Sequence, residues 1–256
     1  MILVGLLPVL FFLVYIFVKD KKKEPISQLL KAFVFGMATC IPAIFIELFL
    51  SDLLFGEGGA QGYFENSTEV FASIALTEEA LKLLALWLVV RKNPYFDEHF
   101  DGIVYAVYVS LGFAAIENVF YLFDNMDSWI SVGVMRALMS IPGHYAFGVL
   151  MGYFYSLYHF CGRRTNHKLL IFLAPYIAHG IYDSLLEPMP IIGCWGLVIL
   201  LFIFYRMQRF CQKKLTEQLE KDMVAETPPP PPSSGELPSS TSSMDVPPPP
   251  PPPSLS

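Results

Sequence analysis

Two adjacent glutamates, Glu78 and Glu79, lie inside an otherwise apolar stretch that covers residues 70–90, and Lys82 follows them one helical turn later. Side chains three and four residues apart are neighbours on a helix, so Lys82 can reach both glutamates, although its single charge offsets only one. Carboxylates inside a membrane are costly and by default mark a functional site. A carboxylate that is kept partly dry can act as a base near neutral pH. The glutamate pair therefore indicates activation of water or transfer of protons.

Three further apolar segments also carry polar side chains that could take part in this chemistry. A histidine can orient a water molecule or stabilise an oxyanion, and a neighbouring carboxylate can hold the imidazole ring in place. The candidates are Glu117 and Asn118 within residues 102–122, His144 within residues 131–158, and His179 and Asp183 within residues 169–187.

These polar residues also have structural explanations. Interhelical hydrogen bonds are common between membrane helices, so helix packing is the ordinary explanation for His144 taken alone. We interpret Asn118 and Lys82 as supporting residues. Asp183 follows His179 by one helical turn and is expected to orient its ring. Catalysis by these residues requires that they lie at a common depth in the membrane.

The composition predicts that all of these residues belong to a polytopic membrane protein. Hydrophobic residues make up 54% and charged residues 16% of the 256-residue chain, whereas about a quarter of the residues in soluble domains are charged. One span requires about 20 apolar residues. We predict an all-α transmembrane helix bundle of about seven spans, near residues 2–18, 29–50, 70–90, 102–122, 131–158, 169–187 and 190–208.

Lysine and arginine follow alternate spans, which predicts the orientation of the bundle. They follow the first, third, fifth and seventh spans, whereas residues 51–69, 123–130 and 188–189 contain neither. Because cytoplasmic loops carry the excess of basic residues, we expect an outside N-terminus and a cytoplasmic C-terminus in the cell membrane. The first segment is interpreted as a retained anchor, because its basic cluster follows the apolar core instead of preceding it.

This orientation places the candidate residues at overlapping depths in the outer half of the membrane. From the helical rise, the glutamate pair lies about 12 Å below the outer face and Glu117 about 8 Å below it. His179 lies about 12 Å and His144 about 20 Å from the same face. Residues that serve only packing would scatter more freely, so the common depth favours one shared site.

Two charged residues near the outer ends of spans are interpreted separately. Glu47, near the end of residues 29–50, is interpreted as an interfacial residue. The guanidinium of Arg136, near the start of residues 131–158, is expected to extend to the lipid headgroups. Neither residue is assigned to the predicted site.

The predicted site favours hydrolysis of a peptide bond by an activated water molecule. Carboxylates and imidazoles around one cavity can take a proton from water and stabilise an oxyanion. No serine or cysteine has a base at helical spacing, so an acyl-enzyme mechanism is less well supported. The cavity would have to be filled with water and open to the outer side.

Zinc is the alternative to a metal-free site. Two histidines and one carboxylate with an open position form a known catalytic zinc set, and His144, His179 and Glu117 are the residues that would supply it. The chain has no His-Glu-x-x-His signature. We favour no cofactor, with zinc as the alternative.

The chain divides into residues 1–214, which hold the predicted spans, and a proline-rich tail, residues 215–256. The tail contains proline runs at residues 228–232 and 247–253 and few apolar residues. Such a composition predicts a disordered cytoplasmic segment with polyproline II character. It is either a spacer or a ligand for a proline-binding module. The acidic tail and the lipid setting predict no nucleic-acid partner.

Five motifs resemble those of the PrsW family of intramembrane proteases, in the same order and over about residues 30–190. This family is similar in its Glu-Glu motif to the CAAX prenyl protease and related membrane proteases. The motifs are Glu78-Glu79-x-x-Lys82, Asp101-Gly-Ile-Val-Tyr105, Gly112-Phe-Ala-Ala-Ile-Glu-Asn-Val-Phe-Tyr121, Pro142-Gly-His144-x-x-Phe147-Gly and His179-Gly-Ile-Tyr-Asp183.

The resemblance implies a protease of the bacterial inner membrane that acts on a membrane-protein substrate. The best-known role of the family is the first cut in an anti-sigma factor, on the outer side of the membrane. Carried over by motif, Glu78 and Glu79 are the leading catalytic candidates and His179 is next. Glu117 and His144 complete the implied site.

Two other functions use the same sequence features. Intramembrane carboxylates and histidines also build proton relays, so a proton-coupled transporter is one alternative. Transporters often carry internal repeats, and we find none in this sequence. A non-catalytic membrane scaffold that presents the proline-rich tail is the other alternative.

Overall fold

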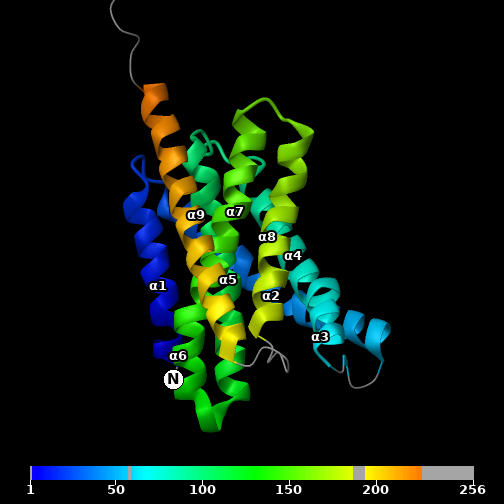
Figure 1. Cartoon of the computed structure of the whole chain (residues 1–256). Coiled ribbons are helices and arrows are strands. Elements are labelled where there is room, and N and C mark those ends of the chain that lie inside the picture. Colours follow the sequence, from blue (N-terminus) through cyan, green and yellow to red (C-terminus); the bar gives the residue numbers. More distant parts are fainter. Residues whose placement is uncertain (1, 57–58, 61, 187–193, 227–256) are drawn as a thin grey trace, which may run out of the picture.

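The computed structural model describes residues 2–56, 59–60, 62–186 and 194–226, and every regular element among them is helical (Figure 1). The α-helices are α1 (Ile2–Lys19), α2 (Ile26–Phe55), α3 (Tyr63–Glu69), α4 (Leu76–Val90), α5 (His99–Asp124), α6 (Trp129–Met135), α7 (Ile141–Phe160), α8 (Thr165–Leu186) and α9 (Cys194–Glu226). Three short helices of other types are η1 (Val70–Ala75), η2 (Met126–Ser128) and η3 (Arg136–Ser140).

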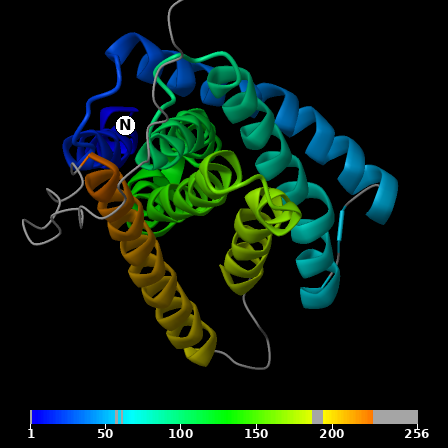
Figure 2. The same ribbon diagram turned by 90° about the horizontal axis from the view of Figure 1, so that it is seen from above.

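Helices α5 and α7 form the centre of the bundle, and the other long helices surround them (Figure 2). Small residues allow the close approach. A Cβ atom at Gly112 of α5 would collide with the backbone carbonyl of Phe33 in α2. One at Gly36 of α2 would collide with the carbonyl of Val109 in α5. Because backbone atoms cannot move aside cheaply, only glycine permits this contact between α2 and α5.

Three helices are long and apolar enough to cross a membrane, namely α2, α5 and α8, and residues Gly5–Lys19 form a shorter apolar helix. The all-α membrane fold is therefore confirmed, whereas the count of about seven spans stays a prediction. One physical reason is visible at residues 70–90. The π-helical η1 takes the first part of this stretch and leaves α4 with 15 residues.

Both π-helical segments directly precede residues of the predicted site. Glu78 follows the end of η1 by three residues, and His144 follows the end of η3 by four. A π turn accommodates one extra residue and so changes the direction of the side chains that follow it. Such turns are frequent at functional sites. They therefore help to direct Glu78 and His144 toward the interior of the bundle.

The boundary predicted at residue 215 is wrong for the helix, because α9 continues to Glu226. The apolar span ends earlier, but the helix goes on as an amphipathic segment. Its buried side chains recur at helical spacing, and they are Cys211, Leu215, Gln218 and Asp222. Residues 227–256, with both proline runs, lie outside the described part of the chain, so the prediction of a disordered tail there is not tested.

The polar end of α9 holds the first turn of α5. The carboxylate of Asp222 accepts hydrogen bonds from the backbone N–H groups of His99 and Phe100, each at 2.8 Å. Asp101 also accepts one from the backbone N–H of Glu98, at 2.7 Å, as part of a capping box. A carboxylate at a helix N-terminus satisfies orphan donors and complements the helix dipole. Residues beyond 214 are thus part of the folded bundle.

We expect the Asp222→Ala variant to lose about 1–2 kcal/mol of stability, because two buried N–H groups of α5 lose their acceptor. Thermal unfolding of the purified protein in detergent measures the change. Glu220→Ala is the matched control, since Glu220 is exposed on the same helix. Equal unfolding temperatures for the two variants would contradict the docking of α9 on α5.

Candidate active site

Most of the predicted site residues line one cavity inside the bundle, which has a volume of about 620 Å³; Glu79, Lys82 and Asn118 lie behind its wall. Helices α2, α4, α5, α7 and α8 all contribute side chains to its wall. The polar residues that line it include Glu47, Glu78, Glu117, His144, His179 and Asp183. The structure thus brings together side chains that are far apart in the sequence, such as Glu79 of α4 and His179 of α8, which are 100 residues apart.

Lys82 is the centre of the polar network. Its ammonium nitrogen Nζ lies 2.8 Å from Glu78 Oε2, 2.9 Å from Glu79 Oε1 and 3.1 Å from His144 Nδ1. An ammonium group has three protons to donate, and all three have acceptors here. Lys82 and Glu79 are fully buried, and Glu78 is 4% exposed. Lys82 therefore contacts both glutamates, and it links α4 directly to α7.

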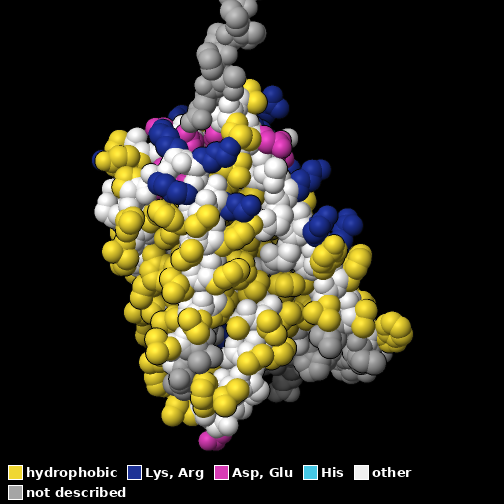
Figure 3. Space-filling model, turned by 90° about the vertical axis from the view of Figure 1, so that its left-hand side faces the viewer, with side chains coloured by type: hydrophobic (Ala, Val, Ile, Leu, Met, Phe, Trp, Pro, Cys, Tyr) yellow, Lys and Arg dark blue, Asp and Glu magenta, His cyan; other side chains and the backbone are white. Residues whose placement is uncertain are grey.

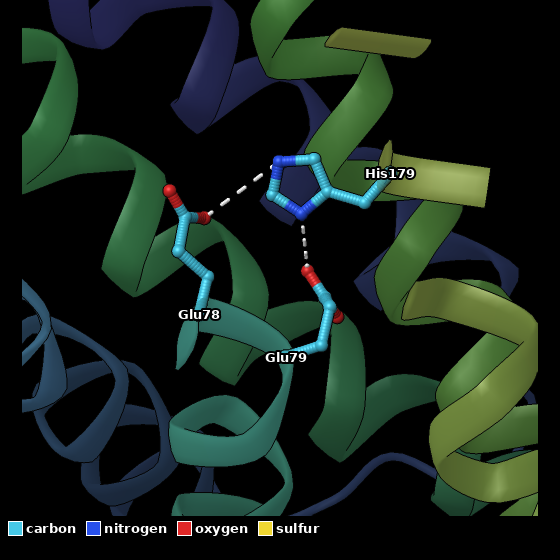
Figure 4. Close-up of side chains that lie close together, drawn as sticks. All are labelled: Glu78, Glu79 and His179. Atoms are coloured by element: carbon cyan, nitrogen blue, oxygen red, sulfur yellow. Dashed lines mark hydrogen bonds and ion pairs between the residues drawn. The ribbon is translucent and has the colours of Figure 1, made fainter. Parts of the chain in front are cut away.

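His179 from α8 completes the surroundings of the glutamate pair (Figure 4). Its Nδ1 lies 2.9 Å from Glu79 Oε1, and its Nε2 lies 3.0 Å from Asp183 Oδ2 and 3.9 Å from Glu78 Oε2. Each ring nitrogen therefore faces a carboxylate, which suits the imidazolium form, in which both nitrogens donate. The predicted stacking of His179 and Asp183 is present in the structure. His179 supplies a second positive charge beside the two glutamates.

Glu117 and His144 form the second half of the network. His144 Nε2 lies 2.8 Å from Glu117 Oε2. Lys82 can only donate, so His144 Nδ1 must accept its hydrogen bond and Nε2 carries the proton toward Glu117. The rings of His144 and His179 are 5.7 Å apart between their centroids. Both predicted histidines thus lie in the same cavity.

Arg136 points into the protein and not toward lipid headgroups as expected from the sequence. Its Nη2 lies 2.9 Å from Glu117 Oε2, and its Nε donates to Asn118 Oδ1 at 2.7 Å. Asn118 in turn donates to the backbone carbonyl of Gly5 at 2.6 Å. The buried carboxylate of Glu117 offers the guanidinium a stronger partner than the lipid surface does. Asn118 therefore holds Arg136 in place and ties α5 to α1, in line with a supporting role.

One further carboxylate, Glu47, lies at the cavity although its sequence position did not assign it to the site. Glu47 of α2 lines the cavity wall, and its Oε1 is buried with no hydrogen-bonding partner among the described residues. Glu47 therefore belongs to the cavity. The sequence did contain a signal, because Glu47 is a carboxylate inside an apolar segment. The sequence does not show, however, which side of α2 faces the cavity.

The donor set can accommodate a metal ion. Glu78, Glu79 and His179 offer ligand atoms that lie within 4.8 Å of one another. Glu79 Oε2 is buried without a hydrogen-bonding partner, so it could take a ligand bond without losing another contact. Imidazole and carboxylate ligands suit zinc. This group shares only His179 with the alternative ligand set expected from the sequence, since Glu117 and His144 engage Arg136 and Lys82 instead.

A bundle of apolar helices that encloses buried carboxylates and imidazoles around a cavity indicates a functional site inside a membrane protein, and this set of groups favours a hydrolase. The sequence model of the "PrsW family intramembrane metalloprotease" matches residues 24–207. The chain therefore belongs to the PrsW family of intramembrane proteases, and the resemblance seen in its motifs is confirmed.

Relatives with the printed name "Protease PrsW" agree with this assignment. The protein of Oceanobacillus iheyensis is 37% identical over 72% of this chain and 81% of its own length. That of Clostridioides difficile is 34% identical over 78% of this chain and 83% of its own length. That of Bacillus subtilis is 34% identical over 71% of this chain and 80% of its own length. No solved structure matches the chain. The chain is thus a membrane protein and a protease.

Proposed function

We propose that this protease is an endopeptidase that cleaves a membrane-anchored protein with an activated water molecule near the outer face of the membrane. One observation carries the proposal. Lys82 joins Glu78, Glu79 and His144 in a single buried network, and His179 contacts Glu79. A packing role would not require two carboxylates, two imidazoles and an ammonium to converge in one network beside a cavity.

The two glutamates differ in their surroundings, which supports different roles. Glu78 lines the cavity, whereas Glu79 is fully buried and contacts Lys82 and His179. We assign Glu78 as the general base, because it can reach a water molecule in the cavity. Glu79 positions the lysine and the imidazole. Glu117 holds His144 and Arg136, so it orients the opposite wall.

Peptide hydrolysis then proceeds by attack of water on the scissile carbonyl carbon. Glu78 takes a proton from the water as the new C–O bond forms. The imidazolium of His179, which lines the cavity beside Glu78, is the positive group that stabilises the oxyanion. Glu78 returns the proton to the leaving nitrogen as the C–N bond breaks, and the products are a carboxylic acid and an amine, which ionise to a carboxylate and an ammonium.

The family is described as a metalloprotease family, and Glu78, Glu79 and His179 are the residues that would hold an ion. A bound zinc ion would supply Lewis acidity for the water and the carbonyl group. Treatment of the purified protein with a chelator, followed by readdition of zinc, tests this. Activity that is lost and then restored supports a metal, and unchanged activity supports the carboxylates alone.

The orientation proposed from the sequence has support in the distribution of charge. Lysine and arginine gather at the end of the bundle where α9 finishes, beyond a broad hydrophobic surface (Figure 3). We assign this end to the cytoplasm, which places the N-terminus outside. The relatives are bacterial proteins, which favours the bacterial cell membrane. A membrane-anchored substrate such as an anti-sigma factor would then be cut on the outer side.

The proposal is tested by finding what accumulates uncleaved in cells that carry only the Glu78→Gln variant. We expect a membrane-anchored protein to accumulate there and to be cut when the wild-type enzyme is added in proteoliposomes. Mass spectrometry of the products gives the cleaved bond and its side of the membrane. If no membrane protein accumulates and the purified enzyme drives proton flux instead, the endopeptidase is excluded and the transporter is favoured.

A further inference from the structure

Glu47 differs from the other carboxylates of the cavity because the chain provides no partner for it. Its Oε1 is buried, and no hydrogen bond or ion pair reaches it from the described residues. Its larger interactions with charged groups are with the carboxylates of Glu78 and Glu117, and the smaller ones are with the cationic groups of Lys82 and His179. The two larger interactions are repulsive.

Three other carboxylates of the cavity have cationic or imidazole partners. Glu78 contacts Lys82, Glu117 contacts Arg136, and Asp183 contacts His179. The exception besides Glu47 is Asp124, an exposed residue that lines the cavity at the end of α5. Among the described residues, the cavity wall thus includes two acidic side chains, Glu47 and Asp124, that form no ion pair with a cationic side chain.

An unpaired carboxylate beside two others is unfavourable in a membrane-embedded cavity. A cation that entered the cavity would relieve the repulsion and would be attracted by the surrounding negative charge. The substrate is the component that enters. A lysine or arginine side chain can extend an apolar stem along the cavity wall and place its charge at Glu47.

We propose that Glu47 is a specificity-determining residue that binds a basic side chain of the substrate, close in sequence to the cleaved bond. The inference rests on the proposed endopeptidase function. Glu47 and Glu78 line the same cavity, so a basic residue held at Glu47 brings a neighbouring peptide bond to Glu78. Glu47 positions the substrate and takes no part in the transfer of protons.

The test compares membrane-anchored peptides that differ at single positions around the cleaved bond. Each position carries lysine, methionine or glutamate in turn, and kcat and KM are measured with the full-length enzyme in proteoliposomes. We expect the wild-type enzyme to prefer lysine over methionine at one position by at least about tenfold in kcat/KM, mainly through KM, because the ion pair forms on binding.

Two variants of Glu47 are expected to change the preference of the enzyme for the lysine peptide. In Glu47→Gln the ratio of kcat/KM for the lysine and methionine peptides should fall toward one. In Glu47→Lys the preference should move to the glutamate peptide, because the charge of the wall is inverted. Asp127→Asn is the matched control, since Asp127 is an exposed acidic residue outside the cavity lining and should leave the ratio unchanged.

Several outcomes would overturn the inference. A wild-type enzyme with no preference for lysine at any position excludes it, even if the Glu47 variants fail to fold. A Glu47→Gln enzyme that keeps the preference excludes it as well, as does one that loses activity equally on every peptide. Failure of the proposed function is separate, because it appears as proteolysis that persists in Glu78→Gln.

Discussion

Glu78→Gln abolishes proteolysis while the helix bundle stays folded. Glutamine keeps the shape and the hydrogen-bonding capacity of the side chain, but its amide cannot take a proton from water. Loss of a general base costs about 10²–10⁴-fold in rate. Because the side chain at position 78 faces the cavity, water there can hydrogen-bond to the glutamine amide, and the substitution should not unfold the protein. Cleavage of a membrane-anchored substrate in proteoliposomes measures kcat, and thermal unfolding in detergent measures stability.

Two companion variants define what the result means. Asp127→Asn removes an exposed acidic side chain and should keep full activity. Glu79→Gln should lose both activity and stability, because the fully buried Glu79 carboxylate accepts from Lys82 and contacts His179. Glu78→Gln with wild-type kcat would remove Glu78 from the role of base. A stable Glu79→Gln enzyme with undiminished activity would remove the positioning role of its carboxylate.

Lys82→Met strongly destabilises the protein, by about 3–5 kcal/mol. Methionine keeps most of the volume but removes the ammonium that contacts two buried carboxylates. Glu78, Glu79 and His144 then lose a donor at 2.8, 2.9 and 3.1 Å, respectively. Removal of one partner of a buried ion pair leaves uncompensated charge, which costs far more than the pair itself contributes. Chemical or thermal unfolding in detergent measures the loss.

A double variant separates this electrostatic cause from a packing defect. Lys82→Met combined with Glu78→Gln removes the carboxylate that His179 approaches less closely, at 3.9 Å against 2.9 Å for Glu79, so it should recover part of the stability while remaining inactive. A double-mutant cycle then gives a coupling energy between Lys82 and Glu78. If the Lys82→Met protein unfolds at the wild-type temperature, the central place of Lys82 in the network is wrong.

The arrangement around Lys82 has a consequence for how the site is assembled. The lysine and both glutamates lie on α4, whereas His144 comes from α7 and His179 from α8. The close approach of α8 depends on Gly180, where a Cβ atom would overlap the ring of Phe71 in η1. The active arrangement therefore forms only when all three helices have packed, and the site depends on the folded bundle as a whole.

The amino-acid sequence by itself determined the features that depend on local spacing. Glu78 and Lys82 meet because they are one turn apart on a single helix, and so do His179 and Asp183. The apolar composition determined the membrane class, and the five motifs determined the family. The last turns of α9 also follow from local spacing, because their buried side chains recur at helical intervals. The proline runs that follow them favoured a disordered tail instead.

Only the tertiary structure decided which side chains from different helices meet. Whether Glu47 faces lipid or the cavity depends on the rotation of α2 about its axis, and the close contact of α2 with α5 sets that rotation. The inward turn of Arg136 depends in the same way on Glu117 and Asn118 of α5. The π-helical turns before Glu78 and His144 shift side-chain directions that an ideal helical period does not predict. Contacts between helices are set by packing over the whole bundle, and spacing along one segment does not contain that information.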